Sequence, residues 1–376
     1  MAQQAGAEGH VPGDMSSRGR GDPARPAAGA GVGREGEAGA VAGGPAKGAD
    51  AGRAPAPELA ARAPVNGGEA GPAAVTAGDG DRAWMTRPER GTVLGIKATL
   101  LFCRVFGRRG AGVLLAVITF YYALFAGPAR RASQDYLRRI GQPHGFWASW
   151  RHIYTFARCA LDRVFLVRGE TSRFRITHTG IEHLRALQQQ GKGALLLGAH
   201  LGSFEAMRAS SVDKRLPIHI LAYWQNAKMI NDFLRTVRAD FDVRVIPIDP
   251  RDTSYILTAK EAIERGELVA VLGDRVGVNE KTCTAQFLGA PARFPTGPYT
   301  LAALLKCPIY LTFGLYHGPD RYDLYCEPFA EQLELPRGRR EAATAAHVQR
   351  YAERLEHYCR LAPLNWFNFY EFWRAE

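Results

Sequence analysis

A histidine and a glutamate stand five positions apart at the end of an apolar segment. His200 and Glu205 lie in the sequence GALLLGAHLGSFE, which covers residues 193–205. An imidazole with a pKa near ~6.5 can take a proton from an alcohol, and a carboxylate bonded to its other nitrogen fixes the tautomer. The spacing therefore indicates a general base, His200, held by Glu205. A loop histidine bonded to backbone, beside a solvated glutamate, is the competing interpretation.

The residues around this pair predict a strand followed by a helix. Residues 194–197 are a short apolar run between glycines, which is typical of a buried strand in an α/β sheet. Ser203 is placed to cap a helix that begins at Phe204. His200 is then expected at the carboxyl edge of the sheet, where ligands of open α/β folds bind. Amides from Gly202 to Phe204 would stabilise an oxyanion there.

A second polar pair follows a later apolar strand. Asp274 and Arg275 come shortly after residues 268–272, which form another buried run. If the two strands are parallel, this pair lies at the same edge of the sheet as His200. A guanidinium presents a planar fork that suits phosphate or carboxylate. The pair is therefore a candidate contact for the acceptor or the oxyanion, and a local ion pair that closes a loop is the alternative.

Two blocks of the sequence resemble those of a known family. Residues 175–208 resemble the first signature block of the lipid A biosynthesis acyltransferases, within the lysophospholipid acyltransferase-like superfamily. Residues 287–302, FLGAPARFPTGPYTLA, are similar to the family's Phe-x-Gly-x-x-Ala-x-x-x-x-Gly segment. The resemblance covers about residue 92 to the C-terminus. It implies a catalytic His-x4-Asp/Glu pair, here His200 and Glu205.

The second block and the C-terminus add further expectations. Phe287, Gly289 and Thr296 are candidate substrate contacts, although the glycines and Thr296 can equally serve turn geometry. Arg275 stands where the family often has glutamine. Residues 365–373, NWFNFYEFW, predict core packing more than lipid contact. This C-terminus resembles a related branch of acyltransferases, found beside aryl-polyene pigment genes, more closely than the lipid A enzymes.

The resemblance implies direct acyl transfer to a hydroxyl of a membrane glycolipid or lipid-linked acceptor. The donor is expected to be acyl carrier protein, with acyl-CoA as the second choice, and no metal or redox cofactor is required. The expected location is the cytoplasmic face of the cell inner membrane. A noncatalytic lipid-binding protein that retains the fold is the alternative. A glycosyltransferase would need a phosphate-binding loop, which the sequence of the folded region does not offer.

The alternation of apolar runs and helical segments predicts an α/β fold. We expect a mostly parallel central sheet with helices on both faces, preceded by a membrane-associated helix and a disordered tail rich in Ala, Gly and Pro. The expected strands are 194–197, 218–223, 243–248, 268–272, 308–315 and an antiparallel 322–326. The expected helices are 181–190, 204–210, 228–238, 253–265 and 347–361.

Composition divides the chain into three parts. Residues 1–82 contain no Phe, Tyr, Trp or Ile, so they cannot bury enough apolar surface to offset chain entropy and are expected to be disordered. Residues 83–140 form the membrane-associated segment and 141–376 the acyltransferase domain. Beyond the tail there are 40 basic and 27 acidic residues, a net charge of +13. This surplus suits an acidic carrier protein, a phosphorylated substrate or anionic lipid, whereas no nucleic-acid motif accompanies it.

One apolar stretch is long enough to reach across a bilayer. Residues 110–129 carry no formal charge and lie between Arg108-Arg109 and Arg130-Arg131. A spanning anchor, a helix within one leaflet and a buried core helix are all consistent with this stretch, and membrane attachment is favoured. The six cysteines are scattered without CxxC spacing, which predicts neither a zinc site nor a disulfide framework.

Overall fold

The computed structural model describes residues 93–209, 217–223, 244–249, 252–277 and 280–373. The expected tail and the expected helix at 228–238 lie outside these residues. The helices are α1 (Val93–Phe125), α2 (Gly127–Arg139), α3 (Phe146–Val167), α4 (Ile181–Gln189), α5 (Phe204–Ala209), α7 (Ser254–Glu264), α8 (Gly297–Leu305) and α9 (Arg340–Leu361), with a short 3-10 turn at Thr171–Arg173.

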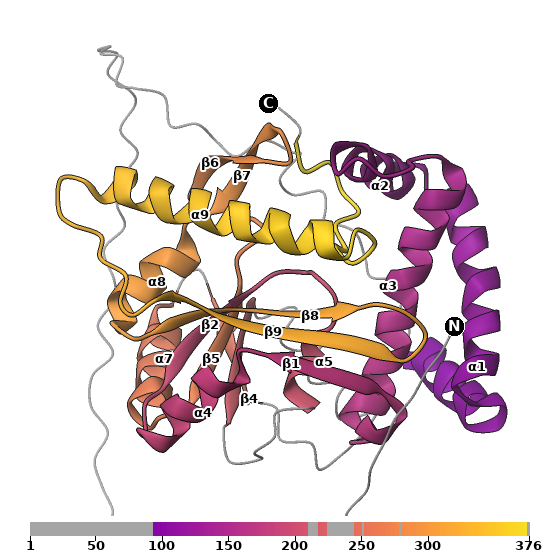
Figure 1. The fold of residues 1–376 in the computed structure, drawn as a ribbon, viewed down its shortest axis with the longest axis horizontal. Coiled ribbons are helices and arrows are strands. Elements are labelled where there is room, and N and C mark those ends of the chain that lie inside the picture. Colours follow the sequence, from indigo (N-terminus) through magenta and orange to yellow (C-terminus); the bar gives the residue numbers. More distant parts are fainter. Residues whose placement is uncertain (1–92, 210–216, 224–243, 250–251, 278–279, 374–376) are drawn as a thin grey trace, which may run out of the picture. The chain divides into compact units, whose positions relative to one another are not determined.

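A sheet of seven strands forms the centre of this part of the chain (Figure 1). Its order is β1-β9-β8-β2-β5-β3-β4. The strands are β1 (Arg175–Thr179), β2 (Ala194–Gly198), β3 (Ile218–Tyr223), β4 (Arg244–Ile248), β5 (Leu268–Leu272), β8 (Ile309–Tyr316) and β9 (Arg321–Ala330). Five neighbouring strands run parallel, and β9 is antiparallel to β8. The predicted α/β class, with a mostly parallel sheet, is confirmed.

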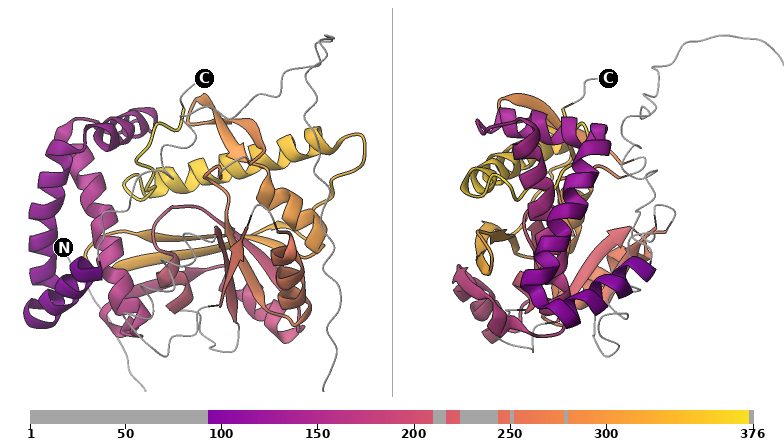
Figure 2. Two further views of the ribbon diagram at one scale, coloured as in Figure 1. Left: turned by 180° about the vertical axis from the view of Figure 1, so that it is seen from behind. Right: turned by 90° about the vertical axis from the view of Figure 1, so that its right-hand side faces the viewer.

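Alternate residues of the central strands pack on opposite faces of the sheet. In β2, Leu195 and Leu197 join a core that α7, α8 and α9 cover, whereas Leu196 faces α4 in a smaller cluster. All five residues of β2 are buried, which is why this strand reads as a continuous apolar run. Figures 1 and 2 show α9 on one side of the sheet and α4 and α5 on the other.

The second sequence block forms part of a hairpin and the helix that follows it. Strands β6 (Thr282–Phe287) and β7 (Ala290–Pro295) pair antiparallel, and α8 follows them directly. Leu288 and Gly289 both have positive φ values, 51° and 78°, which is the backbone of a type I′ turn. The positive φ at the tip of the hairpin therefore explains why glycine occurs at position 289.

The C-terminal aromatic segment closes the core, as predicted. Trp366 is fully buried, and Phe367 and Phe372 are nearly so. Leu201 and Trp366 form an isolated antiparallel bridge, and the amide of Phe367 donates to the carbonyl oxygen of His200 at 2.8 Å. The end of the chain thus lies against the loop that carries the histidine.

Candidate active site at the carboxyl edge of the sheet

His200 and Asp274 meet where two parallel strands end. Gly198 of β2 and Leu272 of β5 are paired in register, so the residues two positions further along each strand lie side by side. The Nδ1 of His200 is 2.8 Å from Oδ1 of Asp274. The backbone N–H of His200 also donates to Oδ2 of Asp274 at 3.0 Å. The expectation that Asp274 shares the edge of His200 is confirmed.

The carboxylate of Asp274 accepts three hydrogen bonds. Its side chain has no exposed surface, and Oδ2 accepts a third hydrogen bond from Nε1 of Trp366 at 3.0 Å. A carboxylate that accepts several hydrogen bonds stays ionised even when it is buried. Burial alone would raise the pKa of Asp274, but the charge of His200, its two hydrogen bonds and the charge of Arg275 hold that pKa below its ordinary value.

The environment of His200 keeps its ring neutral at pH 7. Burial, followed by the nearby charge of Arg275, lowers the pKa of His200 below 6.5, although Asp274 acts in the opposite direction. Because Asp274 is an ionised acceptor, the proton of the neutral ring belongs on Nδ1. Nε2 is then the nitrogen that can accept a proton. The imidazole side chain is 30% exposed, so a substrate hydroxyl can approach it.

The carboxylate expected to hold His200 lies elsewhere. Oε1 of Glu205 is 2.7 Å from Nε of Arg163, which comes from α3. Glu205 is the second residue of α5, and there its side chain points to α3 while the ring nitrogen of His200 is bonded to Asp274. The geometric expectation that Glu205 is the carboxylate on His200 is therefore wrong in this structure. Proximity in sequence favoured Glu205, whereas the parallel register of β2 and β5 brings Asp274 closer.

The turn that follows His200 is fixed by backbone contacts. Gly202 has φ 71°, and an added Cβ would overlap the carbonyl oxygen of Gly314, so only glycine fits. The amide of Gly202 donates to the carbonyl of Asn365 at 2.9 Å, and that of Ser203 to the carbonyl of Gly314 at 2.7 Å. These two amides are already bonded and are not available for an oxyanion, so the expectation is wrong for Gly202 and Ser203.

The predicted cap of α5 is present. The hydroxyl of Ser203 accepts from the amide of Ala206 at 3.2 Å, which satisfies one of the first amides of the helix. Phe204 begins α5 and packs against the small cluster on the α4 face of the sheet. The capping prediction from sequence is confirmed, and Phe204 has a packing role.

Arg275 lies beside the histidine and binds the C-terminal segment. Its Nη2 donates to the carbonyl oxygen of Phe367 at 2.8 Å, and its guanidinium lies 5.9 Å from the ring centre of Tyr370. This contact spans 92 residues of sequence, and the same segment supplies Trp366 to Asp274. Sequence reasoning missed Trp366 and Arg163 as members of the site. The aromatic density of residues 365–373 was the available signal for the tryptophan, and no pattern marked the arginine.

The three candidate substrate contacts of the second block have structural roles. Phe287 is fully buried and stacks on Trp373 with ring centres 5.7 Å apart. Gly289 lies in the hairpin turn, and Thr296 donates its hydroxyl to the carbonyl of Lys281 at 3.0 Å. Packing, turn geometry and a hydrogen bond thus account for these three residue types, and substrate contact is not needed to explain them.

A mainly apolar cavity lies on the α4 and α5 side of the sheet. Its volume is about 460 Å³, within the range of sites for small organic ligands. Phe204 and Met207 of α5 contribute to its wall, and Thr312 of β8 lies between it and Gly198. Its apolar lining includes Ile181, Leu184, Leu196, Ile218, Leu268 and Leu324. Over the described ranges, no group of three His, Cys, Asp or Glu side chains has the arrangement of a metal site.

A carboxylate-held histidine at the carboxyl edge of an α/β sheet has the geometry of a general base in a ligand-binding position. Residues 152–375 match the family model for the bacterial lipid A biosynthesis acyltransferase. This match covers more than half of the chain, and the chain belongs to that family. The family resemblance inferred from sequence is confirmed. A comparison with curated proteins finds no match.

Membership of the family establishes the general type of reaction that the protein catalyses. The protein is an acyltransferase of the lipid A type, which takes an acyl donor and a lipid acceptor. Proteins of this family are typically membrane-associated. Among the described residues, one helical segment, Val105–Phe125, is long and apolar enough to cross a membrane.

Proposed function

We propose that this protein is an O-acyltransferase that moves a fatty acyl group from an acyl thioester to a hydroxyl of a membrane lipid. The observation that carries the proposal is the bond between Nδ1 of His200 and the buried Asp274. This bond fixes Nε2 as the proton acceptor, and the lowered pKa of the ring keeps it neutral near pH 7. A neutral, oriented and partly exposed imidazole is what deprotonation of an alcohol requires.

The transfer would proceed in two steps without an acyl-enzyme. Nε2 of His200 takes the proton of the acceptor hydroxyl while its oxygen attacks the thioester carbonyl carbon. The tetrahedral intermediate then collapses, the C–S bond breaks, and the proton on Nε2 passes to the leaving thiolate. Asp274 stays ionised throughout, and stabilises the imidazolium that forms between the two steps.

We assign Arg275 to the negative charge of the tetrahedral intermediate. Its charge acts on His200 strongly enough to lower the pKa of the ring, so it lies within electrostatic reach of the reacting atoms. Its contact with Phe367 fixes one side of the guanidinium. A fixed cation near the developing oxyanion lowers the barrier more than a mobile one, because it does not need to reorganise.

Net charge and the apolar cavity support our proposals for the donor and the acceptor. The net charge of +13 beyond residue 82 favours acyl carrier protein, which is acidic, over acyl-CoA. The acceptor would be a glycolipid or another lipid-linked hydroxyl, at the cytoplasmic face of the inner membrane. The cavity beside Phe204 and Met207 is apolar enough to hold a fatty chain, although neither His200 nor Asp274 is part of its lining.

The test is a transfer assay with purified full-length protein. The donor is acyl carrier protein loaded with a labelled fatty acyl chain, and the acceptor is membrane lipid. We expect one acylated lipid, detected by mass spectrometry, and a lower rate with acyl-CoA as the donor. The His200→Gln variant should form no product and should keep the thermal unfolding midpoint of the wild-type protein. Turnover by His200→Gln at a near wild-type rate would rule out the proposed base.

A further inference from the structure

The apolar helix α1 lies along α3 (Figures 1 and 2). A kink at Gly107, with φ 65°, separates the part from Arg108 to Phe125 from the start of the helix. Trp150 of α3 donates its indole N–H to the carbonyl of Ala116 at 3.3 Å, and Tyr154 donates its hydroxyl to the carbonyl of Gly112 at 3.2 Å. One face of this part of α1 is therefore bound to α3 at Gly112 and Ala116.

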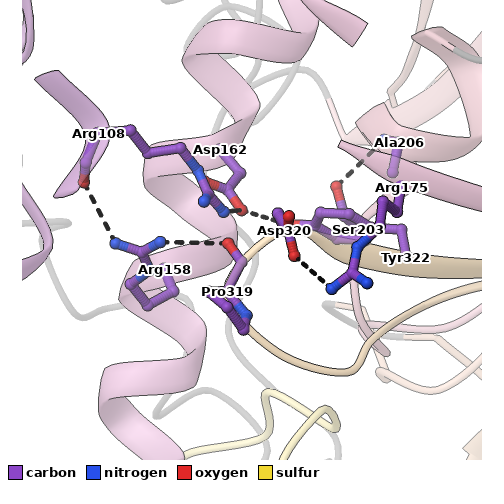
Figure 3. A network of polar contacts seen from close by, with 9 residues as sticks. All are labelled: Arg108, Arg158, Asp162, Arg175, Ser203, Ala206, Pro319, Asp320 and Tyr322. Carbon is purple, nitrogen blue, oxygen red and sulfur yellow. Dashed lines mark hydrogen bonds and ion pairs between the residues drawn. The ribbon is translucent and has the colours of Figure 1, made fainter. Parts of the chain in front are cut away.

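A buried ion pair fixes the start of this part of α1 to the sheet domain. Arg108 binds the carboxylate of Asp162 through two nitrogens, each 2.6 Å from an oxygen. Asp162 has no exposed side-chain surface, and it also accepts the hydroxyl of Tyr322 in β9 at 2.9 Å. Arg158 links the carbonyls of Arg108 and Pro319, as Figure 3 shows. Pulling α1 away would leave Asp162 buried and uncompensated, which is strongly unfavourable.

The opposite side of α3 belongs to the active-site domain. His152 bonds to the carbonyl of Trp366 at 3.0 Å, and Arg163 pairs with Glu205. Helix α3 therefore cannot enter a hydrocarbon core without taking the sheet domain with it. If α1 crossed a bilayer while packed on α3, the exposed Arg151 and the half-exposed Arg163, which pairs with Glu205, would be carried to membrane depth. A charged side chain at the centre of a bilayer is strongly unfavourable.

The outer face of α1 is apolar and exposed. Val113, Val117, Tyr121 and Phe125 follow one another at intervals of four, so they form one row on the helix. Val113 is 69% exposed and Phe125 is 71% exposed. Ile118 and Leu124 widen the row, and Trp147 of α3 lies exposed beside Phe120, with stacked ring centres 5.8 Å apart. A contiguous apolar face of this kind marks an interaction site.

The charges that border this face are mainly positive, although Asp135 and Glu371 lie near Arg131 at one end. Arg109, Arg131 and Arg151 are exposed, and residues 105–134 contain no Asp or Glu. The single acidic residue of α3, Asp162, is buried and forms an ion pair with Arg108. Cations that border an apolar helical face complement the anionic headgroups of a bilayer. A second copy of the same face would bring these like charges together, so it is the less favourable occupant.

We propose that α1 is a monotopic anchor, whose outer face from Arg108 to Phe125 lies in the plane of one leaflet of an anionic bilayer and does not cross it. Burial of the apolar row supplies the attachment, and the bordering arginines select anionic lipid. The contacts with α3 hold the sheet domain on the aqueous side of the helix. This inference rests on packing and charge and is independent of the proposed catalytic mechanism.

Fluorescence depth measurements test the orientation directly. Single cysteines replace Val113, Val117, Tyr121 and Leu124 of the full-length protein in a Cys283→Ser background, because the other five native cysteines are buried. Each is labelled with an environment-sensitive dye and bound to vesicles of phosphatidylcholine and phosphatidylglycerol in equal parts. Brominated lipids then report the depth of each probe. We expect one shallow depth for all four positions, whereas a spanning helix would separate positions 113 and 124 by about 16 Å at 1.5 Å per residue. Graded depths would overturn the proposal.

A charge substitution on the same face provides the second test. Val117→Asp is expected to reduce flotation with these vesicles at least tenfold, and Ala160→Asp, at an exposed position of α3, should float like the wild-type protein. Both variants should keep the wild-type unfolding midpoint, since neither side chain is buried. Unchanged flotation of Val117→Asp would contradict the anchor. So would a dimer that Val117→Asp converts to a monomer while vesicle binding stays the same, because that result would assign the face to a second copy.

Discussion

Replacement of Asp274 by asparagine is expected to abolish most of the acyl transfer while the fold remains. The carboxylate accepts from Nδ1 of His200, from its backbone amide and from Trp366. An asparagine can present its NH2 group to the ring, which favours the tautomer with the proton on Nε2, and the base is then lost. The equivalent loss in other histidine–carboxylate pairs is about 10⁴-fold in kcat. We expect a decrease of about 10³–10⁴-fold here, or about 4–5 kcal/mol in the activation free energy.

The pH profile separates this effect from a simple loss of structure. In the wild-type protein the pKa of His200 is below 6.5, so kcat/KM should fall as the pH drops through that pKa and the ring becomes protonated. Asp274 raises the pKa of His200, and its removal should move this acidic limb to still lower pH. The assay is initial rate against pH from about 5 to about 8, where histidine titrates.

Glu205→Gln is the matched control for the carboxylate. Glu205 pairs with Arg163 and makes no bond to the ring, so the tautomer of His200 should survive its neutralisation. We expect the loss in kcat to be at least tenfold smaller than for Asp274→Asn. The reverse order, with Glu205→Gln the more damaging and Asp274→Asn close to wild type, would refute the assignment of Asp274.

Three further substitutions test other parts of the structure. Arg275→Met removes a charge that lowers the pKa of His200, so the acidic limb of kcat/KM should move to higher pH while kcat falls; a shift to lower pH would contradict the assignment. Gly202→Ala should lower the free energy of unfolding by about 2–3 kcal/mol in urea titrations, because of its positive φ and the blocked Cβ position, and a neutral effect would be inconsistent with this turn. Arg108→Met leaves Asp162 buried without its cation and should cost about 3–5 kcal/mol, whereas a loss below about 1 kcal/mol would indicate an exposed pair.

The sheet was predictable because its strands have strong local signals. The strands β2 and β5 are continuous apolar runs, buried on both faces except at Leu272, and the pattern around them left few alternatives. The cap at Ser203 follows from a local hydrogen bond between residues three apart, and local contacts are what sequence patterns report best. The turn at Gly289 agrees with the turn geometry that the glycines of that block allowed, whereas no pattern indicated that the residues on either side pair as strands.

The partner of His200 was not predictable from the spacing of residues. A carboxylate five positions away is conspicuous in the sequence, but the ring bonds to Asp274, which is 74 residues distant. The register between two parallel strands decides this contact, and register is a tertiary property. The same holds for Trp366, which reaches Asp274 only because the C-terminal segment folds back over the sheet edge. Long-range contacts of this kind have no local sequence pattern. Only composition, such as the high density of aromatic residues, indicates that such a segment is buried.

Nitrogen-15 NMR of the histidine rings tests the central claim most directly. The signal of His200 is assigned by its disappearance in His200→Gln, and the long-range couplings show which ring nitrogen carries the proton. At pH 7 we expect a neutral ring with the proton on Nδ1 and an unprotonated Nε2, and a change of tautomer in Asp274→Asn. A wild-type ring with its proton on Nε2, or one that stays charged at pH 7, would contradict the proposal that Asp274 prepares His200 to act as the base.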